Sequence, residues 1–135
     1  MGIRLEISIA DHDAIAAFAR GSSEEICGLL IGREGNIETL VPCKNVAADP
    51  ARFFEIDPAT LIAAHRAARA GGPSVIGHYH SHPSGVTTPS ARDAADAAPD
   101  GAIWIITDGR TLAAWRAGRD GAVHGRFDPV ELIRA

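Results

Sequence analysis

The sequence predicts a mixed α/β domain of the α+β kind, in which helices flank a central, mostly antiparallel sheet. Short apolar runs of strand length are interspersed with alanine-rich stretches of helical length. Near the C-terminal end, Asp108-Gly109 and Asp120-Gly121 separate apolar runs, a pattern typical of an antiparallel meander. Because 135 residues are enough to bury a core, we expect one domain over residues 1–135.

The expected strands are short runs rich in apolar and β-branched residues, with turn-forming residues between them. They cover residues 3–9, 25–31, 37–41, 53–56, 75–80, 103–107, 112–115 and 123–127. The run EICGLLI at 25–31 is apolar almost throughout and is therefore expected inside the sheet. Trp104 and Trp115 lie in the meander and are expected in the core.

Three helices are expected from their capping signals. They run from Asp11 to Gly21, from Asp57-Pro58 through an alanine-rich segment to Gly71-Gly72, and from Ser90 to Pro99, with a further helical turn over residues 129–134. Asp57-Pro58 is the strongest of these starts, because it combines a capping residue with proline at the first helical position. In the first helix, Ala14, Ile15 and Phe18 would form the apolar face.

The composition is that of an ordinary globular protein, with 46% hydrophobic and 22% charged residues. A net charge of −4 argues against general nucleic-acid binding. The sequence has no 18-residue apolar run and no basic leader before an apolar segment, so we expect a cytoplasmic protein that does not bind membranes. Cys27 and Cys43 have no metal-binding spacing and are expected to be small buried residues rather than a disulfide.

Residues 77–93, GHYHSHPSGVTTPSARD, contain the most informative cluster of polar residues. On a strand, residues two apart point the same way, so His80 and His82 would project from one face. Ser90 would start a helix with Asp93 in its first turn, and the intervening turn-rich loop can bring that helix back over the strand end. Two imidazoles, one carboxylate and a water form a four-coordinate zinc site of the catalytic type.

The same residues also have a simpler interpretation. Ser90-Ala91-Arg92-Asp93 matches an N-terminal capping box, although such a box prefers Glu or Gln in its last place. A pair of histidines on a strand often just faces solvent. The occurrence of all these parts within fourteen positions favours a metal site. The two interpretations are compatible, because a serine that caps the helix can also face the metal.

His80-Ser81-His82-Pro83, followed after six residues by Ser90-Ala91-Arg92-Asp93, resembles the JAMM motif H-[ST]-H-P-x(6)-S-x-x-D of the MPN-domain metalloproteases. Upstream, residues 25–32 match the E-x-C-G-L-L-x-G strand of that family. The two motifs occur in the family's order, and the resemblance extends over nearly the whole chain. It implies a single MPN domain with a cytidine-deaminase-like sandwich.

The resemblance also implies roles for individual residues. His80, His82 and Asp93 would bind one zinc ion, whose fourth ligand is a water. Glu25 would hydrogen-bond to that water and act as the general base, and Ser90 would help to bind the oxyanion. Substrate-binding residues are not assigned, although residues 45–54 and 84–89 are plausible walls of a cleft.

The activity implied by the resemblance is hydrolysis of the bond after the C-terminal Gly-Gly of a ubiquitin-like protein. In minimal bacterial members this substrate is often a sulfur-carrier protein. Only nine residues separate Asp93 from Ile103, which leaves no room for the long insertion that helps eukaryotic deubiquitinases to hold a second ubiquitin. A small carrier protein is therefore the expected partner.

Two alternatives stay open. The first is membership of the related branch associated with DNA repair. That branch usually has asparagine between the two histidines, whereas this chain has Ser81 there. A non-catalytic MPN scaffold would generally lack metal ligands, and this chain retains every one. His78 is either a second residue of the site or a strand histidine without a role, whereas surface positions are expected for His12, His65 and His124.

Overall fold

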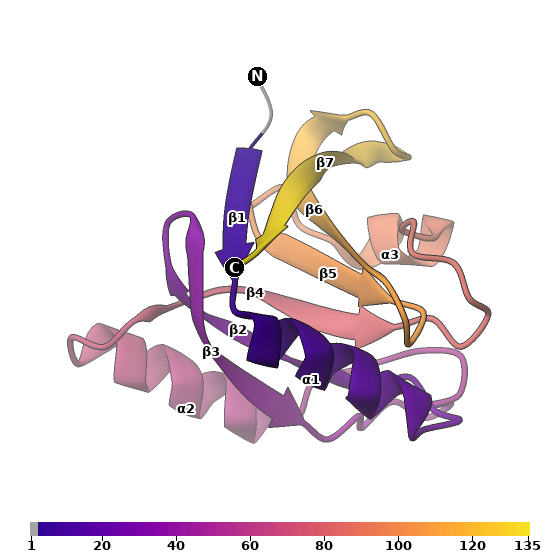
Figure 1. The fold of residues 1–135 in the computed structure, drawn as a ribbon, viewed down its shortest axis with the longest axis horizontal. Coiled ribbons are helices and arrows are strands. Elements are labelled where there is room, and N and C mark those ends of the chain that lie inside the picture. Colours follow the sequence, from indigo (N-terminus) through magenta and orange to yellow (C-terminus); the bar gives the residue numbers. More distant parts are fainter. Residues whose placement is uncertain (1–2) are drawn as a thin grey trace.

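Seven strands form one mixed sheet, and three helices pack around it (Figure 1). The computed structural model describes residues 3–135. The strands are β1 (Ile3–Ile7), β2 (Cys27–Arg33), β3 (Asn36–Cys43), β4 (Ser74–Ser81), β5 (Ile103–Thr107), β6 (Leu112–Gly121) and β7 (Gly125–Arg134). The helices are α1 (Ile9–Arg20), α2 (Pro58–Arg69) and α3 (Ala91–Asp96). The predicted α+β class is confirmed.

The strand order β1-β3-β2-β4-β5-β6-β7 closes on itself through β1, which pairs with both β3 and β7. The pairs β2–β3, β2–β4, β5–β6 and β6–β7 are antiparallel, and the meander predicted for the C-terminal part is therefore present. The pairs β4–β5, β1–β7 and β1–β3 are parallel. The first and last strands of the described chain thus lie side by side in the sheet (Figure 1).

Strand alternation divides the buried side chains of β4 and β5 between two faces. On one face, Tyr79 and Ile105 belong to a cluster that includes Ile15 of α1. On the other face, Trp104 packs with Phe127 and with Ala97, just after α3. His78 and His80 share this second face, because each lies in ring contact with Trp104. The candidate site therefore faces away from α1.

Four local predictions at the N-terminal and central segments are corrected by the structure. Ser8 rather than Asp11 caps α1, because its side chain accepts the Asp11 N–H and the strand before it ends at Ile7. Phe18 of α1 stays 41% exposed. β2 begins at Cys27, two residues later than expected, since the N–H groups ahead of it bond outside the ladder. Residues 53–56 contribute one isolated bridge, between Asn45 and Ile56, rather than a strand.

The last expected element was also wrong, because residues 129–134 continue β7 and do not form a helical turn. Glu131 and Leu132 are good helix formers, but the segment lies between β6 and β1 and pairs with both. Val130 is buried there beside Ile3 and Ala114. Burial and ladder hydrogen bonds from two strands override the local preference.

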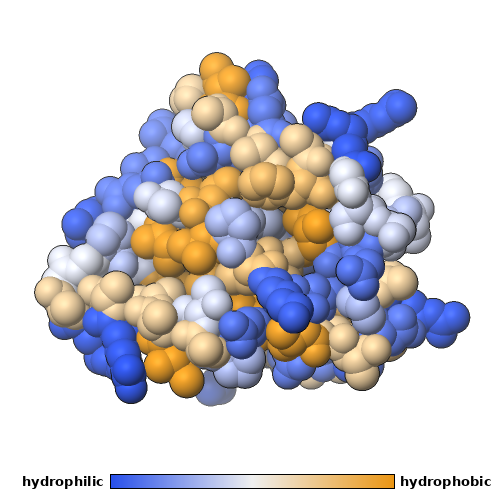
Figure 2. Space-filling model, turned by 90° about the horizontal axis from the view of Figure 1, so that it is seen from below, coloured by the Kyte–Doolittle hydropathy of each residue, from blue (hydrophilic) through white to orange (hydrophobic). Residues whose placement is uncertain are grey.

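The face seen from below carries hydrophobic surface among hydrophilic side chains (Figure 2). Helices α1 and α2 lie on this lower side of the molecule (Figure 1). Ile9, Phe18 and Ile62 of these helices are large apolar side chains that remain exposed. Within residues 3–135, none of the helices has the length and apolar character needed to cross a membrane.

Candidate metal centre and catalytic cleft

The pairing of β2 with β4 brings Glu25 and the histidines together. Cys27 lies opposite His80 in this antiparallel pair. The register continues past the strand end, since the Ser81 N–H donates to the Ile26 carbonyl and the Ile26 N–H donates to Ser81 Oγ at 2.9 Å. Glu25, one residue further back, therefore reaches the position beside His82.

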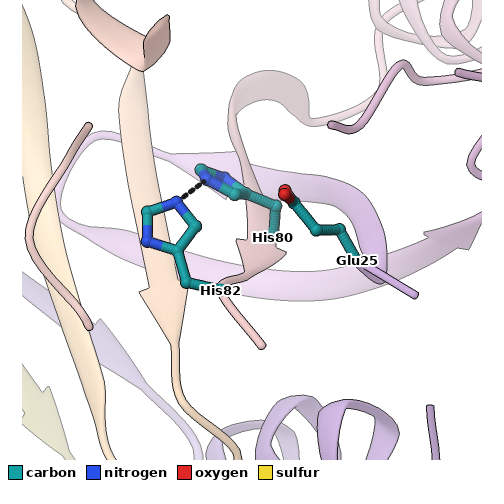
Figure 3. Close-up of side chains that lie close together, drawn as sticks. All are labelled: Glu25, His80 and His82. Carbon is teal, nitrogen blue, oxygen red and sulfur yellow. Dashed lines mark hydrogen bonds between the residues drawn. The ribbon is translucent and has the colours of Figure 1, made fainter. Parts of the chain in front are cut away.

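Four side chains that the sequence predicted for the site converge at one point. His80 Nε2 lies 3.0 Å from His82 Nε2 and 3.5 Å from Asp93 Oδ1, and His82 Nε2 lies 3.1 Å from Asp93 Oδ2. One oxygen of Glu25 and one nitrogen of each imidazole all lie within 4.8 Å of one another. Figure 3 shows the Glu25 carboxylate pointing toward the two imidazoles. His80 is fully buried, and Glu25 and Asp93 are nearly so.

The spacing of these donor atoms fits a zinc ion. Zinc–ligand bonds of about 2.0–2.1 Å in a tetrahedron place neighbouring ligand atoms about 3.3 Å apart. The 3.0 Å between the two imidazole nitrogens lies near that value, and Asp93 faces each ring with a different oxygen, Oδ1 at 3.5 Å from His80 and Oδ2 at 3.1 Å from His82. Two imidazoles and a carboxylate also form a donor set used by catalytic zinc, with the fourth position left open.

Hydrogen bonding sets the tautomer of His82. Its Nδ1 lies 2.8 Å from the Val86 carbonyl oxygen, which can only accept, so Nδ1 carries the hydrogen. In the neutral ring, Nε2 is then unprotonated and free to act as a metal ligand. The backbone N–H of His82 donates to the Thr107 carbonyl at the end of β5. The Val86 contact thus orients the ring, and the Thr107 contact fixes the main chain that carries it.

His80 is held by aromatic packing instead. Phe54 stacks on its ring with centroids 4.1 Å apart and an angle of 16° between the planes. The buried Nδ1 of His80 has no hydrogen-bond partner among the described residues. His78, on the same face, packs edge-on against Trp104 and lies 6.2 Å from the His80 ring. Phe54 lies in the segment predicted as a cleft wall, but its contact with His80 was not predicted.

Ser90 and Asp93 form the capping box that was the simpler interpretation of their spacing. The Asp93 N–H donates to Ser90 Oγ at 3.0 Å, and the Ser90 N–H donates to Asp93 Oδ2 at 2.9 Å. The same carboxylate faces both histidines, so capping and site geometry coexist as expected. Because Ser90 Oγ is only an acceptor in this box, its hydroxyl hydrogen remains able to donate to another group.

Burial and mutual contact shift the pKa values of these groups. Burial, reinforced by Asp93, raises the pKa of Glu25 to about 7, although His82 opposes the shift. Burial also acts to raise the pKa of Asp93, but hydrogen bonds with His80 and His82 outweigh it and lower that pKa below its usual range. Burial lowers the pKa of His80 and keeps the ring neutral. A carboxyl group with a pKa near 7 can accept and return a proton at neutral pH.

These groups border an open cleft of about 300 Å³. Its lining includes Glu25, His82 and Asp93 together with Ser90. Both segments predicted as walls contribute, through residues 51–54 on one side and Ser84 on the other, whereas Asn45 itself lies outside the lining. Arg92 and Asp96 of α3, not predicted from the sequence, also line this cleft.

Two contacts that position the site were missed because they cross between distant segments. Ser81 was considered only as one position of the JAMM motif. In the structure its hydroxyl oxygen accepts a hydrogen bond from the backbone N–H of Ile26, the residue after Glu25. Phe54 comes from the long connection between β3 and α2, whose path no local pattern indicates. Glu24 is exposed, as expected. His12, His65 and His124 lie outside this cluster.

Comparisons with known proteins agree with this geometry. The family of prokaryotic homologs of the JAB domain matches residues 10–118. A desampylase from Haloferax volcanii is 33% identical over 120 residues, covering 82% of this chain and 86% of that protein. A probable TtuB-protein conjugate cleaving protease from Thermus thermophilus is 37% identical over 82 residues, covering 61% of this chain and 55% of that protein.

A solved structure of a JAB1/MPN domain protein from Archaeoglobus fulgidus has the same fold. It matches with a TM-score of 0.59 at 20% identity and covers 98% of this chain and 100% of that one. Its similarity in shape extends beyond the residues of the site and supports the fold assignment for the described chain. The family match, the relatives and the shared fold together show that this chain is a member of the prokaryotic JAB/MPN domain family.

Proposed function

We propose that this chain is a zinc-dependent metallopeptidase that hydrolyses the bond after the C-terminal Gly-Gly of a ubiquitin-like or sulfur-carrier protein. The observation that carries the proposal is the convergence of His80, His82 and Asp93, with donor atoms 3.0–3.5 Å apart, beside the Glu25 carboxylate in an open cleft. In this proposal the three residues are zinc ligands and Glu25 is the general base.

Zinc bound at this centre would supply Lewis-acid chemistry, which lowers the pKa of water toward about 7 and polarises a carbonyl group. The nucleophile is water, and a carboxylate oxygen of Glu25 lies close enough to the imidazoles to accept its proton. It can then return the proton to the departing amine. Ser90 would donate its hydroxyl hydrogen to the oxygen that becomes negative in the tetrahedral intermediate. Asp93 supplies negative charge from the first turn of α3.

The proposed substrate follows from the relatives and the shape of the site. One relative is named for cleaving TtuB-protein conjugates, and another is named as a desampylase. A Gly-Gly tail has no side chains to clash with the walls at residues 51–54 and Ser84. Only residues 97–102 connect α3 to β5, so the extra element that would hold a second ubiquitin is absent from that connection. A compact carrier with an extended glycine tail suits this cleft.

The decisive experiment compares wild type with Glu25→Gln, and uses Glu24→Gln as the matched control. Each protein is analysed for zinc content and incubated with a ubiquitin-like carrier extended beyond Gly-Gly. We expect about one zinc per chain in all three proteins. Cleavage is expected in wild type and Glu24→Gln, whereas Glu25→Gln should be inactive or strongly impaired.

Two outcomes would contradict the proposal. Equal cleavage by wild type and Glu25→Gln would remove Glu25 from the mechanism. Zinc binding without cleavage of any extended carrier would favour a scaffold role. A carrier whose Gly-Gly is replaced by two bulkier residues tests the tail requirement, because it should resist cleavage by the active proteins.

A further inference from the structure

Asn45 uses its whole side chain to hold other parts of the backbone. Its Nδ2 lies 2.9 Å from the carbonyl oxygens of both Glu25 and Phe53. A third carbonyl oxygen, that of Pro50, lies 3.3 Å away. An amide nitrogen has two hydrogens, so two of the three carbonyl oxygens share one hydrogen. Every donor of this side chain is therefore directed at a backbone carbonyl.

The oxygen of the same side chain is equally engaged. Asn45 Oδ1 accepts the Ala47 N–H at 3.0 Å and the Glu55 N–H at 3.1 Å. These bonds hold both ends of the loop that supplies one wall of the cleft. Aspartate could accept from the N–H groups but has no hydrogen for the carbonyls, and a hydroxyl has only one. The two donors and the acceptor oxygen of the amide are therefore all used here.

Glu25 is the point where this network meets the candidate centre. Its carbonyl is bound by Asn45, and its own N–H donates to the Pro50 carbonyl at 2.8 Å. The next residue, Ile26, is held by Ser81, which lies between the two histidines. The main chain of Glu25 is thus fixed by the cleft loop on one side and next to β4 on the other. The main-chain position from which the carboxylate reaches His80 and His82 is therefore held from both sides.

We propose that Asn45 is a positioning residue, which holds the main chain of Glu25 so that its carboxylate stays opposite the imidazole pair. The catalytic part of this inference rests on the proposed function, whereas the holding of Glu25 does not. Misplacement of a catalytic group by about 1 Å can cost about a hundredfold in rate. Loosening of Glu25 is therefore expected to lower kcat rather than substrate binding.

The test uses Asn45→Ala and Asn45→Asp, with Asn36→Ala as the matched control. Asn36 is exposed at the start of β3, and its side chain is not involved in the contacts described here. Amide hydrogen exchange is measured at Glu25 and Ile26, and compared with Leu29 and Leu30 inside β2. We expect exchange at Glu25 and Ile26 to accelerate about tenfold or more in both Asn45 variants, with little change in β2 or in Asn36→Ala.

Zinc content and steady-state kinetics on the extended carrier complete the test. In the Asn45 variants, zinc should stay near one per chain, kcat should fall about tenfold to a hundredfold, and KM should change by less than about threefold. Wild-type exchange at Glu25 and Ile26 in Asn45→Ala would overturn the inference, whether or not any carrier is cleaved. A raised KM with unchanged kcat would also overturn it, and would assign Asn45 to the cleft wall alone.

Failure of the proposed function has a different signature. In that case wild type itself cleaves no extended carrier. Accelerated exchange confined to Glu25 and Ile26 in the Asn45 variants would then still support the holding of Glu25.

Discussion

Phe54 lies face to face with His80, with ring centroids 4.1 Å apart and planes inclined by 16°. The residue comes from the loop between β3 and α2, and the histidine from β4, so the contact joins the cleft wall to the candidate metal centre. Because His80 Nδ1 has no hydrogen-bond partner among the described residues, this stacking is a principal constraint on the ring.

Phe54→Ala is therefore expected to weaken zinc binding as well as the fold. Loss of a half-buried aromatic contact should reduce the free energy of unfolding by about 1–2 kcal/mol. The mobile imidazole should raise the Kd for zinc, measured by competition with a chelator. Phe54→Tyr keeps the ring and serves as control. An unchanged zinc Kd in Phe54→Ala would show that stacking does not orient His80.

Removal of a proposed ligand should abolish the metal site. His80→Ala and Asp93→Asn are expected to purify with little zinc, whereas His65→Ala, altered on the exposed side of α2, should retain about one ion per chain. Since a metal that binds only the folded state stabilises it, zinc should raise the Tm of wild type and His65→Ala but not of the other two variants. Full zinc occupancy in Asp93→Asn would contradict the assignment of Asp93.

Ser90→Ala separates the two roles proposed for this serine. Loss of the helix cap should cost about 1 kcal/mol of unfolding free energy, measured by urea denaturation. Loss of the hydroxyl donor should lower kcat by about 10²–10³ with zinc retained. Ser90→Thr preserves a hydroxyl at the cap and should recover part of the unfolding free energy and part of kcat. A destabilised variant with wild-type kcat would leave Ser90 with its capping role only.

The two cysteines should be unreactive in the folded protein. Both thiols are free, and burial raises the pKa of Cys27 to about 12 and also raises that of Cys43. At pH 8, about 10⁻⁴ of Cys27 would be thiolate, the form that reacts. In Cys43→Ser, mass spectrometry should show slow alkylation of Cys27 by iodoacetamide until denaturant is added. Rapid alkylation of this folded variant would show that Cys27 is accessible.

Asp108 gives a pH-dependent prediction at a residue outside the candidate metal centre. The Thr111 N–H and the Arg110 N–H both donate to its carboxylate, and these bonds lower its pKa. A carboxylate with a lowered pKa in the folded state stabilises the fold above its unfolded pKa of about 3.8, and the effect disappears as pH falls through the folded value. The Asp108 carboxylate lies at the surface, so its contribution to the free energy of unfolding should be modest.

In denaturation experiments, wild type should therefore be more stable than Asp108→Asn at pH 6, and the difference should shrink at pH 3 and below. Asp120→Asn is the control for loss of a surface carboxylate; the predicted turn at Asp120-Gly121 is wrong, because both residues belong to the end of β6. A constant difference between wild type and Asp108→Asn across this range would exclude a contribution from ionised Asp108.

Local patterns predicted most elements, because turns, caps and apolar runs are set by neighbouring residues. The start of α2 at Asp57-Pro58 and the turn at Asp108-Gly109 are examples. The segment 129–134 could not be predicted in this way, since its strand conformation depends on β1, at the opposite end of the described chain. The expected strand at 53–56 failed for a related reason, because the Phe53 carbonyl and the Glu55 N–H bond to the side chain of Asn45 rather than to a neighbouring strand.

The candidate site was more predictable than its surroundings. His80 lies on β4 and His82 directly follows its end, where the alternation of the strand still brings both rings together, and Asp93 follows Ser90 by one helical turn. Short spacing therefore already determines much of their geometry. Bringing Glu25 to them needs the β2–β4 register, for which the motif order was the only indication. The supporting contacts from Phe54 and Asn45 depend on the path of a long loop, which has no sequence periodicity, and the contact from Ser81 depends on how β2 pairs with β4.

The parallel seam between β1 and β7 constrains when this molecule can fold during its synthesis. Ile3 lies beside Val130, so the first strand lacks its β7 partner until residues 130–134 have been synthesised. Closure of the sheet therefore waits for β7, and so distant a pairing makes it slow. A nascent chain stalled before β7 would present that edge to neighbouring polypeptides and be prone to aggregate.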